Sequence, residues 1–553
     1  MATALLPSQV LAGGLPQQWQ LGLLALLPVL LLSSYLLLAS TRRRRGSGAR
    51  RRIRSWRRLR LPPGPPRLPI LGNLHQLGAL PHQSLRDLAR RHGPAMLLRL
   101  GSVPTLVVSS SAAAREVMKA HDVDCCSRPD TPGARRLSYD HKDVAFAPYS
   151  EYWREMRKLF VVEFLSMRRV QAASYAREAE VDKLVARLAA MDGEAVQLED
   201  HAFGLMDGVI GTVAFGNIYG TEQFKHKKTF HEVLDEAMSA KAGFSAEDYY
   251  PNALGRIVDR LTGAAARREK VFRDLDAFFD VIIDQHLDPS RPTPEHGPDL
   301  IDAFVALMKE RRHHLEGSSL RFTRDHIKGL LSNVFTASVD TSSVTMVWAM
   351  AELIRRPAMM KKVQEEIRAA VGDKAERVHH DDMPKLRYLK MVVKETLRLH
   401  PAVPLLLPRE TLRHVGICGY DVPAKTRVLV NAWAIGRDPA IWGNNTEVFE
   451  PERFDGKRFD GSDTDFNGAH FELLPFGAGR RMCPGVAMGV ATIELTLANL
   501  LYCFDWAMPE GMAPEDVNME EAGGLTVHKK TPLLLVPTRY NTAGCIADEI
   551  NLH

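Results

Sequence analysis

The chain has 553 residues, of which 45% are hydrophobic and 25% charged, and its formal net charge is +6. These proportions are ordinary for a globular protein with a substantial core, and they exclude a disordered or collagen-like chain. The six cysteines form no C-x-x-C pair and show no framework spacing, which excludes a disulfide-framed secreted domain and favours a reducing compartment.

An almost wholly apolar segment, residues 21–39, follows the first twenty residues. As a helix, these 19 residues would rise about 28 Å, which is enough to span the hydrocarbon core of a bilayer. A cleaved signal peptide is the alternative. Against it, residues 1–20 carry no basic region, and no small-x-small cleavage site precedes the charged segment that follows. We therefore predict a transmembrane anchor at 21–39.

Arginines dominate the next segment, residues 42–60. Such a run is usually a solvated surface, and nucleic-acid binding is another alternative. Directly after a spanning helix, however, a basic run keeps its side of the membrane cytoplasmic. Residues 1–20 are then lumenal and the rest of the chain is cytosolic. The run can also contact membrane lipid headgroups, and we expect no nucleic-acid partner.

Four prolines between residues 61 and 68 predict a stiff, extended segment. We interpret residues 40–74 as an Arg-rich and Pro-rich hinge that sets how the cytosolic body sits at the membrane; a plain linker is the alternative. The body would span residues 75–538, with a C-terminal tail at 539–553.

The body is predicted to be mostly α-helical with small β-sheets. Residues 84–92 are amphipathic, residues 96–100 and 105–109 are strand-like runs around a turn, and residues 112–120 are helical again. Residues 121–150 look irregular, and a long loop in a compact domain is usually functional or mobile. Helical patterns then run from residue 152 through 310, and Trp153 and Arg157 share one helical face.

A long, largely apolar helix is predicted from Arg324 to about Arg355, with Thr323 as its N-cap and Pro357 ending it. Its middle, residues 337–343, holds an acid and several hydroxyls, which are costly to bury without a purpose. Ala337 and Ser338 are small enough to leave room for a ligand. Asp340 and Thr341 could pass protons into that space. The alternative is a helix whose polar groups are satisfied internally and do no chemistry.

Glu395 and Arg398 lie three residues apart on another predicted helix, bounded by Pro384 and Pro401. A surface ion pair is the simplest interpretation. The flanking residues are apolar, however, so we expect the pair to be buried and to need a further partner, which Arg453 could supply.

The segment Phe476–Gly485 contains Cys483 in a glycine-rich loop, just before an apolar helical run, residues 486–502. A lone cysteine in such a place is usually a small core hydrophobe. Here the helix N-terminus and the loop amides are expected to stabilise a thiolate and to lower its pKa. Bare glycine backbone would let a large flat group approach, and one thiolate from one loop suits a haem iron.

The pattern Phe-x-x-Gly-x-Arg-x-Cys-x-Gly resembles the haem-binding loop of the cytochrome P-450 family. The other segments match the family in order, and the Arg-rich flank and the Pro-Pro-Gly-Pro hinge resemble plant microsomal members. The helix 324–355 departs from the family pattern by having Ser338 in place of glycine. The resemblance implies a long central helix over the haem and one N-terminal transmembrane helix.

The resemblance also implies roles for residues. Cys483 would bind the iron of haem b (iron protoporphyrin IX), Asp340 and Thr341 would relay protons, and Glu395, Arg398 and Arg453 would form a structural lock. The implied cofactor-binding residues are Trp153, Arg157, Arg409, Phe476, Arg481, Cys483 and Gly485. The implied substrate pocket contains Ala337, Ser338, Val403, Leu406, Leu407, Leu525 and Thr526.

The implied activity is oxygen insertion with electrons from NADPH-cytochrome P-450 reductase, at the endoplasmic reticulum membrane, on a small apolar or aromatic substrate. Residues 122–129, 211–219 and 418–423 resemble plant members that convert an aromatic aldoxime to a cyanohydrin in cyanogenic glucoside synthesis. The alternatives are a hydroxylase of a phenylpropanoid or terpenoid, a non-oxygenating haem-thiolate dehydratase or isomerase, and a non-catalytic membrane haem or lipid carrier.

Overall fold

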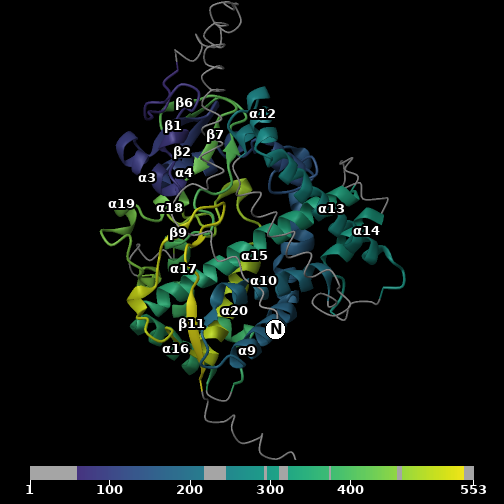
Figure 1. The fold of residues 1–553 in the computed structure, drawn as a ribbon, viewed down its shortest axis with the longest axis vertical. Coiled ribbons are helices and arrows are strands. Elements are labelled where there is room, and N and C mark those ends of the chain that lie inside the picture. The colour runs from purple at the N-terminus through teal and green to yellow at the C-terminus, as the bar shows by residue number, and fades with distance from the viewer. Residues whose placement is uncertain are drawn as a thin grey trace, which may run out of the picture. The chain divides into compact units, whose positions relative to one another are not determined.

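The computed structural model describes residues 59–216, 245–291, 296–309, 322–372, 375–456 and 464–540 (Figure 1). The predicted transmembrane segment at 21–39, nearly all of the arginine run and most of the predicted tail lie outside these residues. The same is true of residues 217–219, the end of one of the three segments that resemble aldoxime-converting members.

The described chain is mostly helical with small sheets, as predicted. Its helices up to residue 287 are α3 (Pro81–His92), α4 (Ser111–Arg115), α5 (Asp122–Cys125), α6 (Pro132–Leu137), α7 (Glu151–Phe160), α8 (Met167–Ala172), α9 (Ser174–Ala189), α10 (Leu198–Phe215), α12 (Ala253–Leu261) and α13 (Ala264–Leu287). The later helices are α14 (Leu300–Lys309), α15 (Arg324–Ile354), α16 (Pro357–Val371), α17 (Arg387–Leu399), α18 (Ala432–Ile435), α19 (Pro439–Trp442) and α20 (Val486–Cys503).

Short helical turns join these elements. The 3₁₀ turns are η1 (Leu74–Gln76), η4 (Ala246–Asp248), η5 (His380–Lys385), η6 (Pro451–Phe454), η7 (Gly479–Arg481) and η8 (Pro514–Asp516). Two π-helical segments, η2 (Glu116–Ala120) and η3 (Val161–Leu165), continue α4 and α7. Such segments are frequent at functional sites, and both of these contribute side chains to the cavity described below.

The strands are β1 (Ala95–Leu100), β2 (Val103–Val108), β3 (Val196–Gln197), β4 (Arg409–Glu410), β5 (Val415–Ile417), β6 (Tyr420–Val422), β7 (Arg427–Val430), β8 (Phe504–Ala507), β9 (Glu521–Ala522), β10 (His528–Lys529) and β11 (Leu534–Arg539). The main sheet has the order β1-β2-β7-β4. β1 pairs antiparallel with β2, β2 parallel with β7, and β7 antiparallel with β4, where Arg409 lies opposite Val428. The smaller sheets have the orders β3-β11-β8, β10-β9 and β5-β6.

Helix α15 crosses the middle of the helical body and packs against α10 and α20 (Figure 1). It begins after Thr323 and ends at Ile354, just before Pro357, close to the predicted bounds. Buried residues occur on all its sides, so its apolar pattern does not mark a single face. A helix enclosed in this way can present a polar mid-section to an internal cavity.

Residues 121–150 are more ordered than the sequence suggests, since α5 and α6 form within them. Thr131 caps α6 by accepting from the Ala134 amide, and Pro132 supplies the first-turn residue. These capping signals are short and lie among several prolines. The sequence pattern therefore did not predict the two helices.

Among the described residues, α20 is the one helix long and apolar enough to cross a membrane. It is mostly buried inside the protein, as a core helix is.

Candidate active site

The loop Phe476–Gly485 folds back on itself ahead of α20. The Cys483 amide donates to the Phe476 carbonyl at 2.9 Å, and Gly477 and Gly479 have φ of +68° and +69°. A Cβ on Gly479 would lie 2.3 Å from the Met118 carbonyl oxygen. This glycine is therefore required by close packing against η2 and by its backbone conformation, rather than by the approach of a flat group.

The Cys483 sulfur faces an internal cavity. Burial raises the pKa of the Cys483 thiol, although the Gly485 amide, which donates to the sulfur, and the Arg157 guanidinium both oppose this. The expectation of a lowered pKa is therefore wrong for the protein taken alone. Loss of hydration outweighs one amide and one cation, so a bound cation such as a metal would be needed to hold the thiolate.

Four arginines line one wall of this cavity: the buried Arg128, Arg409 and Arg481, and the half-buried Arg157. Their hydrogen bonds go mainly to backbone carbonyls: Arg157 to Met482 at 2.6 Å, Arg481 to Cys126 at 2.7 Å and Ala147 at 2.6 Å, and Arg128 to Ala145 at 2.9 Å and Pro408 at 2.7 Å. Arg409 donates to the Ala478 carbonyl at 2.7 Å and pairs with Asp122 at 3.0 Å.

This wall is short of negative charge. Burial, together with the neighbouring guanidinium of Arg409, lowers the pKa of Arg481 to about 9, despite the opposing effect of Cys126. Burial and the three nearby guanidinium groups of Arg481, Arg409 and Arg157 also lower the pKa of Arg128. Because crowded, desolvated cations are costly, the wall is suited to an anionic group. Guanidinium forks match carboxylates well.

Trp153 does not line the cavity. Its indole N–H donates to the Val144 carbonyl at 2.9 Å, and its ring packs against the Arg481 guanidinium, 3.9 Å from the ring centroid. Of the residues that the resemblance assigns to the cofactor, Trp153 is thus placed behind the arginines, where it holds Arg481 in position.

The wall formed by α15 contains Ala337, Ser338 and Thr341. The Thr341 hydroxyl donates back to the Ala337 carbonyl at 2.7 Å, and the Ser343 hydroxyl to the Val339 carbonyl, also at 2.7 Å. These two hydroxyls are thus satisfied within the helix. Asp340 is absent from the described cavity lining; its carboxylate points to His528, with Oδ1 and Nε2 3.0 Å apart.

Apolar side chains close the rest of the cavity, whose volume is about 290 Å³. All the residues expected to form the substrate pocket line it: Ala337, Ser338, Val403, Leu406, Leu407, Leu525 and Thr526. No carboxylate occurs among the described lining residues. The cavity therefore suits an uncharged apolar or aromatic molecule beside the arginine wall.

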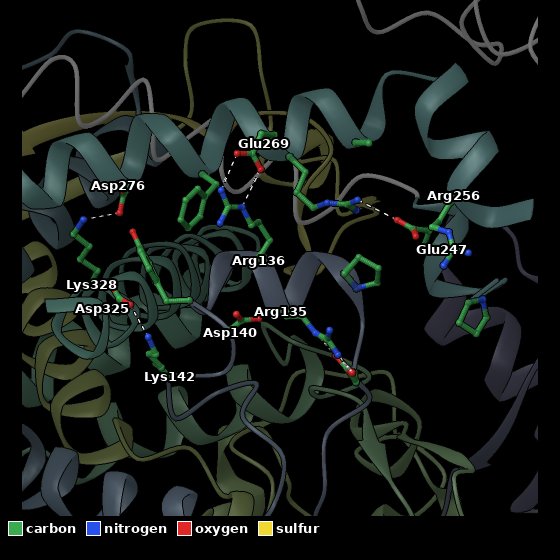
Figure 2. A pocket seen from close by; sticks show the side chains of 17 residues that line it. Arg135, Arg136, Asp140, Lys142, Glu247, Arg256, Glu269, Asp276, Asp325 and Lys328 are labelled. Carbon is green, nitrogen blue, oxygen red and sulfur yellow. Dashed lines mark hydrogen bonds and ion pairs between the residues drawn. The ribbon is translucent and has the colours of Figure 1, made fainter. Parts of the chain in front are cut away.

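A larger open pocket, of about 850 Å³, lies among α6, α13 and the start of α15 (Figure 2). Its charged side chains largely pair with one another: Arg136 with Glu269 at 2.7 Å, Lys142 with Asp325 at 2.5 Å and Lys328 with Asp276 at 2.6 Å. With its charges satisfied internally and no cysteine in its lining, this pocket is a weaker candidate than the smaller cavity.

Glu395, Arg398 and Arg453 meet in the core with side chains at most 1% exposed. Arg398 donates to both carboxylate oxygens of Glu395, at 2.6 and 2.7 Å, and the Arg453 Nε lies 3.3 Å from Glu395 Oε1. The remaining guanidinium groups donate to backbone carbonyls, including those of Gly436 and Trp442. The cluster lies outside the described cavity lining, so it does not contact a molecule in the cavity. Its hydrogen bonds tie α17 to the segment before the cysteine loop.

Sequence reasoning missed several lining residues. Arg128 lies in a segment that the sequence analysis singled out, and a lone arginine before a proline carried no separate signal. The others are apolar residues on α7, η3 and α10: Phe160, Phe164, Leu165, Met206 and Ile210. Ordinary core positions share their pattern, so only the fold separates them from the core.

Comparisons with known proteins match this architecture. The family model described as Cytochrome P450 matches residues 62–536. A 4-hydroxyphenylacetaldehyde oxime monooxygenase of Sorghum bicolor is 61% identical over 98% of this chain and 99% of its own length. A 2-methylbutanal oxime monooxygenase of Manihot esculenta is 48% identical over 87% of this chain and 92% of its own.

Solved structures agree with this. A zebrafish cytochrome P450 structure with progesterone is 26% identical, with a TM-score of 0.70, and the match covers 83% of this chain and 99% of that one. The family match over most of the length, the close relatives and the shared fold lead to one conclusion: this chain belongs to the cytochrome P450 family of haem-dependent monooxygenases.

Proposed function

We propose that this enzyme converts an aromatic aldoxime, 4-hydroxyphenylacetaldehyde oxime or a close analogue, to a cyanohydrin in cyanogenic glucoside synthesis. The observation that carries the proposal is the 61% identity, over 98% of the chain, to a sorghum enzyme named for that oxime. Overall the aldoxime loses water to give a nitrile. One atom of O₂ is then inserted into the C–H bond next to the nitrile, and the other leaves as water with two protons and two electrons that NADPH supplies through the reductase.

The residues of the cavity fit a haem. Cys483 would hold its iron, and Arg128, Arg157, Arg409 and Arg481 would bind its two propionates, which supply the negative charge that the arginine wall lacks. When bound, haem with a thiolate ligand supplies the activation of O₂ and the cleavage of its O–O bond. The chain itself orients the substrate and excludes water.

Thr341 and Asp340 are proposed to deliver protons to the reaction. The Thr341 hydroxyl reaches the cavity and accepts a proton at Oγ1 as it gives one up, while its bond to the Ala337 carbonyl fixes its direction. Asp340, the preceding residue on α15, is proposed to renew that proton; its carboxylate contacts His528. Thr341→Ala should keep the haem but lower product formed per NADPH consumed several-fold, measured together with hydrogen peroxide release.

The cavity supports an uncharged substrate. Ser338 and Thr526 offer hydroxyls near an otherwise apolar surface, which can bond the oxime's hydroxyl and nitrogen while its aromatic ring packs on Leu406 and Leu525. A carboxylic acid would find its cationic partners only at the arginines that we assign to the propionates.

Spectral titration of the purified holoenzyme tests the proposal. 4-Hydroxyphenylacetaldehyde oxime should shift the Soret band at lower concentration than 2-methylbutanal oxime, and far below a panel of phenylpropanoids and terpenoids. Turnover of the oxime to cyanohydrin should require NADPH and reductase. If only compounds of a non-oxime class bind tightly, the proposed aldoxime substrate is wrong. Cyanohydrin formed without NADPH would favour the non-oxygenating alternative.

We further propose a single-pass endoplasmic reticulum protein, with residues 21–39 as the anchor, residues 40–74 as the hinge and residues 75–538 as the cytosolic catalytic body. Family members take electrons from a redox partner, and we propose NADPH-cytochrome P-450 reductase for this role. In microsomes, protease added outside should degrade the body. Alkaline carbonate should fail to extract the full chain, but should extract a variant lacking residues 1–40.

A further inference from the structure

Asp340 faces away from the cavity. It is on α15 directly beside Thr341, yet it is not among the described cavity-lining residues. Its Oδ1 lies 3.0 Å from the His528 Nε2; the Asp340 side chain is 9% exposed and the His528 side chain 38% exposed. The two residues thus form a polar contact that links the protein surface, at His528, to the largely buried Asp340 beside Thr341.

The short hairpin of β9 and β10 positions His528. His528 pairs with Ala522 in this hairpin, and its ring stacks on Phe203 of α10, with a centroid separation of 6.0 Å and an interplanar angle of 9°. The preceding residue is held on both sides: the Val527 amide donates to Ala402, and its carbonyl accepts from Trp348, each at 3.0 Å. The ring is therefore held against Asp340 while one side stays open to water.

Several other charged groups on the surrounding elements have partners of their own. On α10, Glu199 accepts from the Leu533 amide and Asp200 from Gln197. In the hairpin, Glu521 pairs with His82, and the buried Lys529 donates to the Asn518 carbonyl. Lys530, which follows the hairpin, pairs with Glu520 at 2.8 Å. Asp340 is thus the acid that the His528 ring contacts.

We propose that His528 is the positioning residue through which Asp340 exchanges protons with water. The imidazolium gives its Nε2 proton to the Asp340 carboxylate and is left neutral, with its remaining proton on Nδ1. Once Asp340 has passed that proton on, Nε2 takes up a new proton from solvent hydronium, so that no net charge accumulates. Histidine suits this step because it is the side chain that changes charge between pH 5 and 8. The inference rests on the proton-delivery role of Asp340 in the proposed function.

The test compares wild type with His528→Gln and His528→Ala, reconstituted with reductase in phosphatidylcholine vesicles and supplied with 4-hydroxyphenylacetaldehyde oxime. Both variants should form several-fold less product per NADPH and more hydrogen peroxide. In wild type this ratio should fall as pH rises from 6 to 9, because the proposed step needs the protonated form of a histidine, a side chain that in general changes charge between pH 5 and 8. In both variants the pH-dependent fall should be absent. The reduced, carbon monoxide-treated Soret band and the oxime-induced spectral shift should be unchanged.

His414→Gln is the matched control. His414 and Asp421 form another His–Asp pair with a 3.0 Å separation, on the hairpin of β5 and β6, away from the cavity. This variant should behave as wild type. A His528→Gln enzyme with wild-type product yield and pH dependence would overturn the proposal, as would an equal loss in His414→Gln or a loss accompanied by a damaged Soret band.

A double-mutant cycle tests the contact independently of turnover. Thermal unfolding of the holoenzyme is compared for wild type, His528→Gln, Asp340→Asn and the double variant. The shifts should be non-additive, and additivity at both pH 6 and pH 9 would overturn the pairing. If wild type does not turn over the oxime, the proposed substrate fails. The cycle and peroxide release per NADPH without substrate still decide the role of His528.

Discussion

Burial dominates the chemistry of Cys483 at the scale of single residues. The loop amide and Arg157 favour the thiolate, but loss of water raises the pKa of the thiol overall. A bound metal cation can stabilise the thiolate enough to offset the free-energy cost of burying its charge, whereas the loop amide and Arg157 do not. The thiolate role proposed for Cys483 therefore depends on a bound metal cation.

Cys483→Ser should abolish the thiolate-type Soret band of the reduced, carbon monoxide-treated protein. A serine hydroxyl gives up its proton far less readily than a thiol and is a harder ligand. Cys503→Ser, a change at a buried cysteine far from the cavity lining, is the control and should leave that band in place. An intact band in Cys483→Ser would show that Cys483 is not the iron ligand.

Arg128 provides a second residue-scale test. Arg128→Leu should speed haem loss to an acceptor apoprotein about 10–100-fold, because a charge-assisted hydrogen bond contributes about 1.5–3 kcal/mol. Arg128→Lys should fall between Arg128→Leu and wild type. The control is Arg135→Leu in the same segment, since Arg135 is exposed and pairs with Asp130. Equal rates of haem loss in Arg128→Leu and wild type would contradict the role.

At the scale of elements, the contact of α17 with α20 carries an unusual carboxyl group. Burial raises the pKa of Glu494 on α20 to about 7, even though Lys390 and Lys394 of α17 oppose it. A carboxyl whose pKa is higher in the folded than in the unfolded state binds its proton more tightly when folded. Stability from this group is therefore present at low pH and is lost as pH rises from about 4.5 to about 7.

Glu494→Gln should stabilise the holoenzyme at pH 8 by about 2–3 kcal/mol, because glutamine avoids the buried charge. The gain should vanish near pH 5, where the wild-type carboxyl is protonated. Thermal unfolding across this range measures it. Exposed Glu510→Gln should show no such pH dependence. A gain of the same size at every pH would point to packing instead.

At the scale of the whole molecule, the buried cluster of Glu395, Arg398 and Arg453 joins α17 to a later part of the chain, residues 436–453. Its groups satisfy one another and several backbone carbonyls in a space that water does not enter. Such a cluster contributes little net energy when intact, but is costly to break.

Glu395→Gln should destabilise the protein by about 3–5 kcal/mol and lower haem content at expression, because it leaves the buried Arg398 without a counter-charge and leaves Arg453 only Glu450. Chemical denaturation and the haem-to-protein ratio measure this. Lys361→Ala breaks an exposed pair with Glu365 on α16 and should change stability by less than about 0.5 kcal/mol. A Glu395→Gln protein as stable as this control would show that the cluster is dispensable.

The sequence by itself determined the features that depend on neighbours along the chain. These are the cysteine loop, the bounds of α15 from Thr323 to Pro357, the strands β1 and β2, and the pairing of Glu395 with Arg398 three residues later. Each follows from local periodicity, caps or the identity of residues a few positions apart.

Only the tertiary structure decided which way the polar groups point and which distant segments meet. It set Arg128 beside Arg481, placed Trp153 behind the arginines and turned Asp340 from the cavity toward His528, which lies 188 positions further along the chain. It also showed that burial outweighs the loop's effect on the Cys483 thiol. The physical reason is that desolvation and charge pairing depend on three-dimensional surroundings, which no local pattern records.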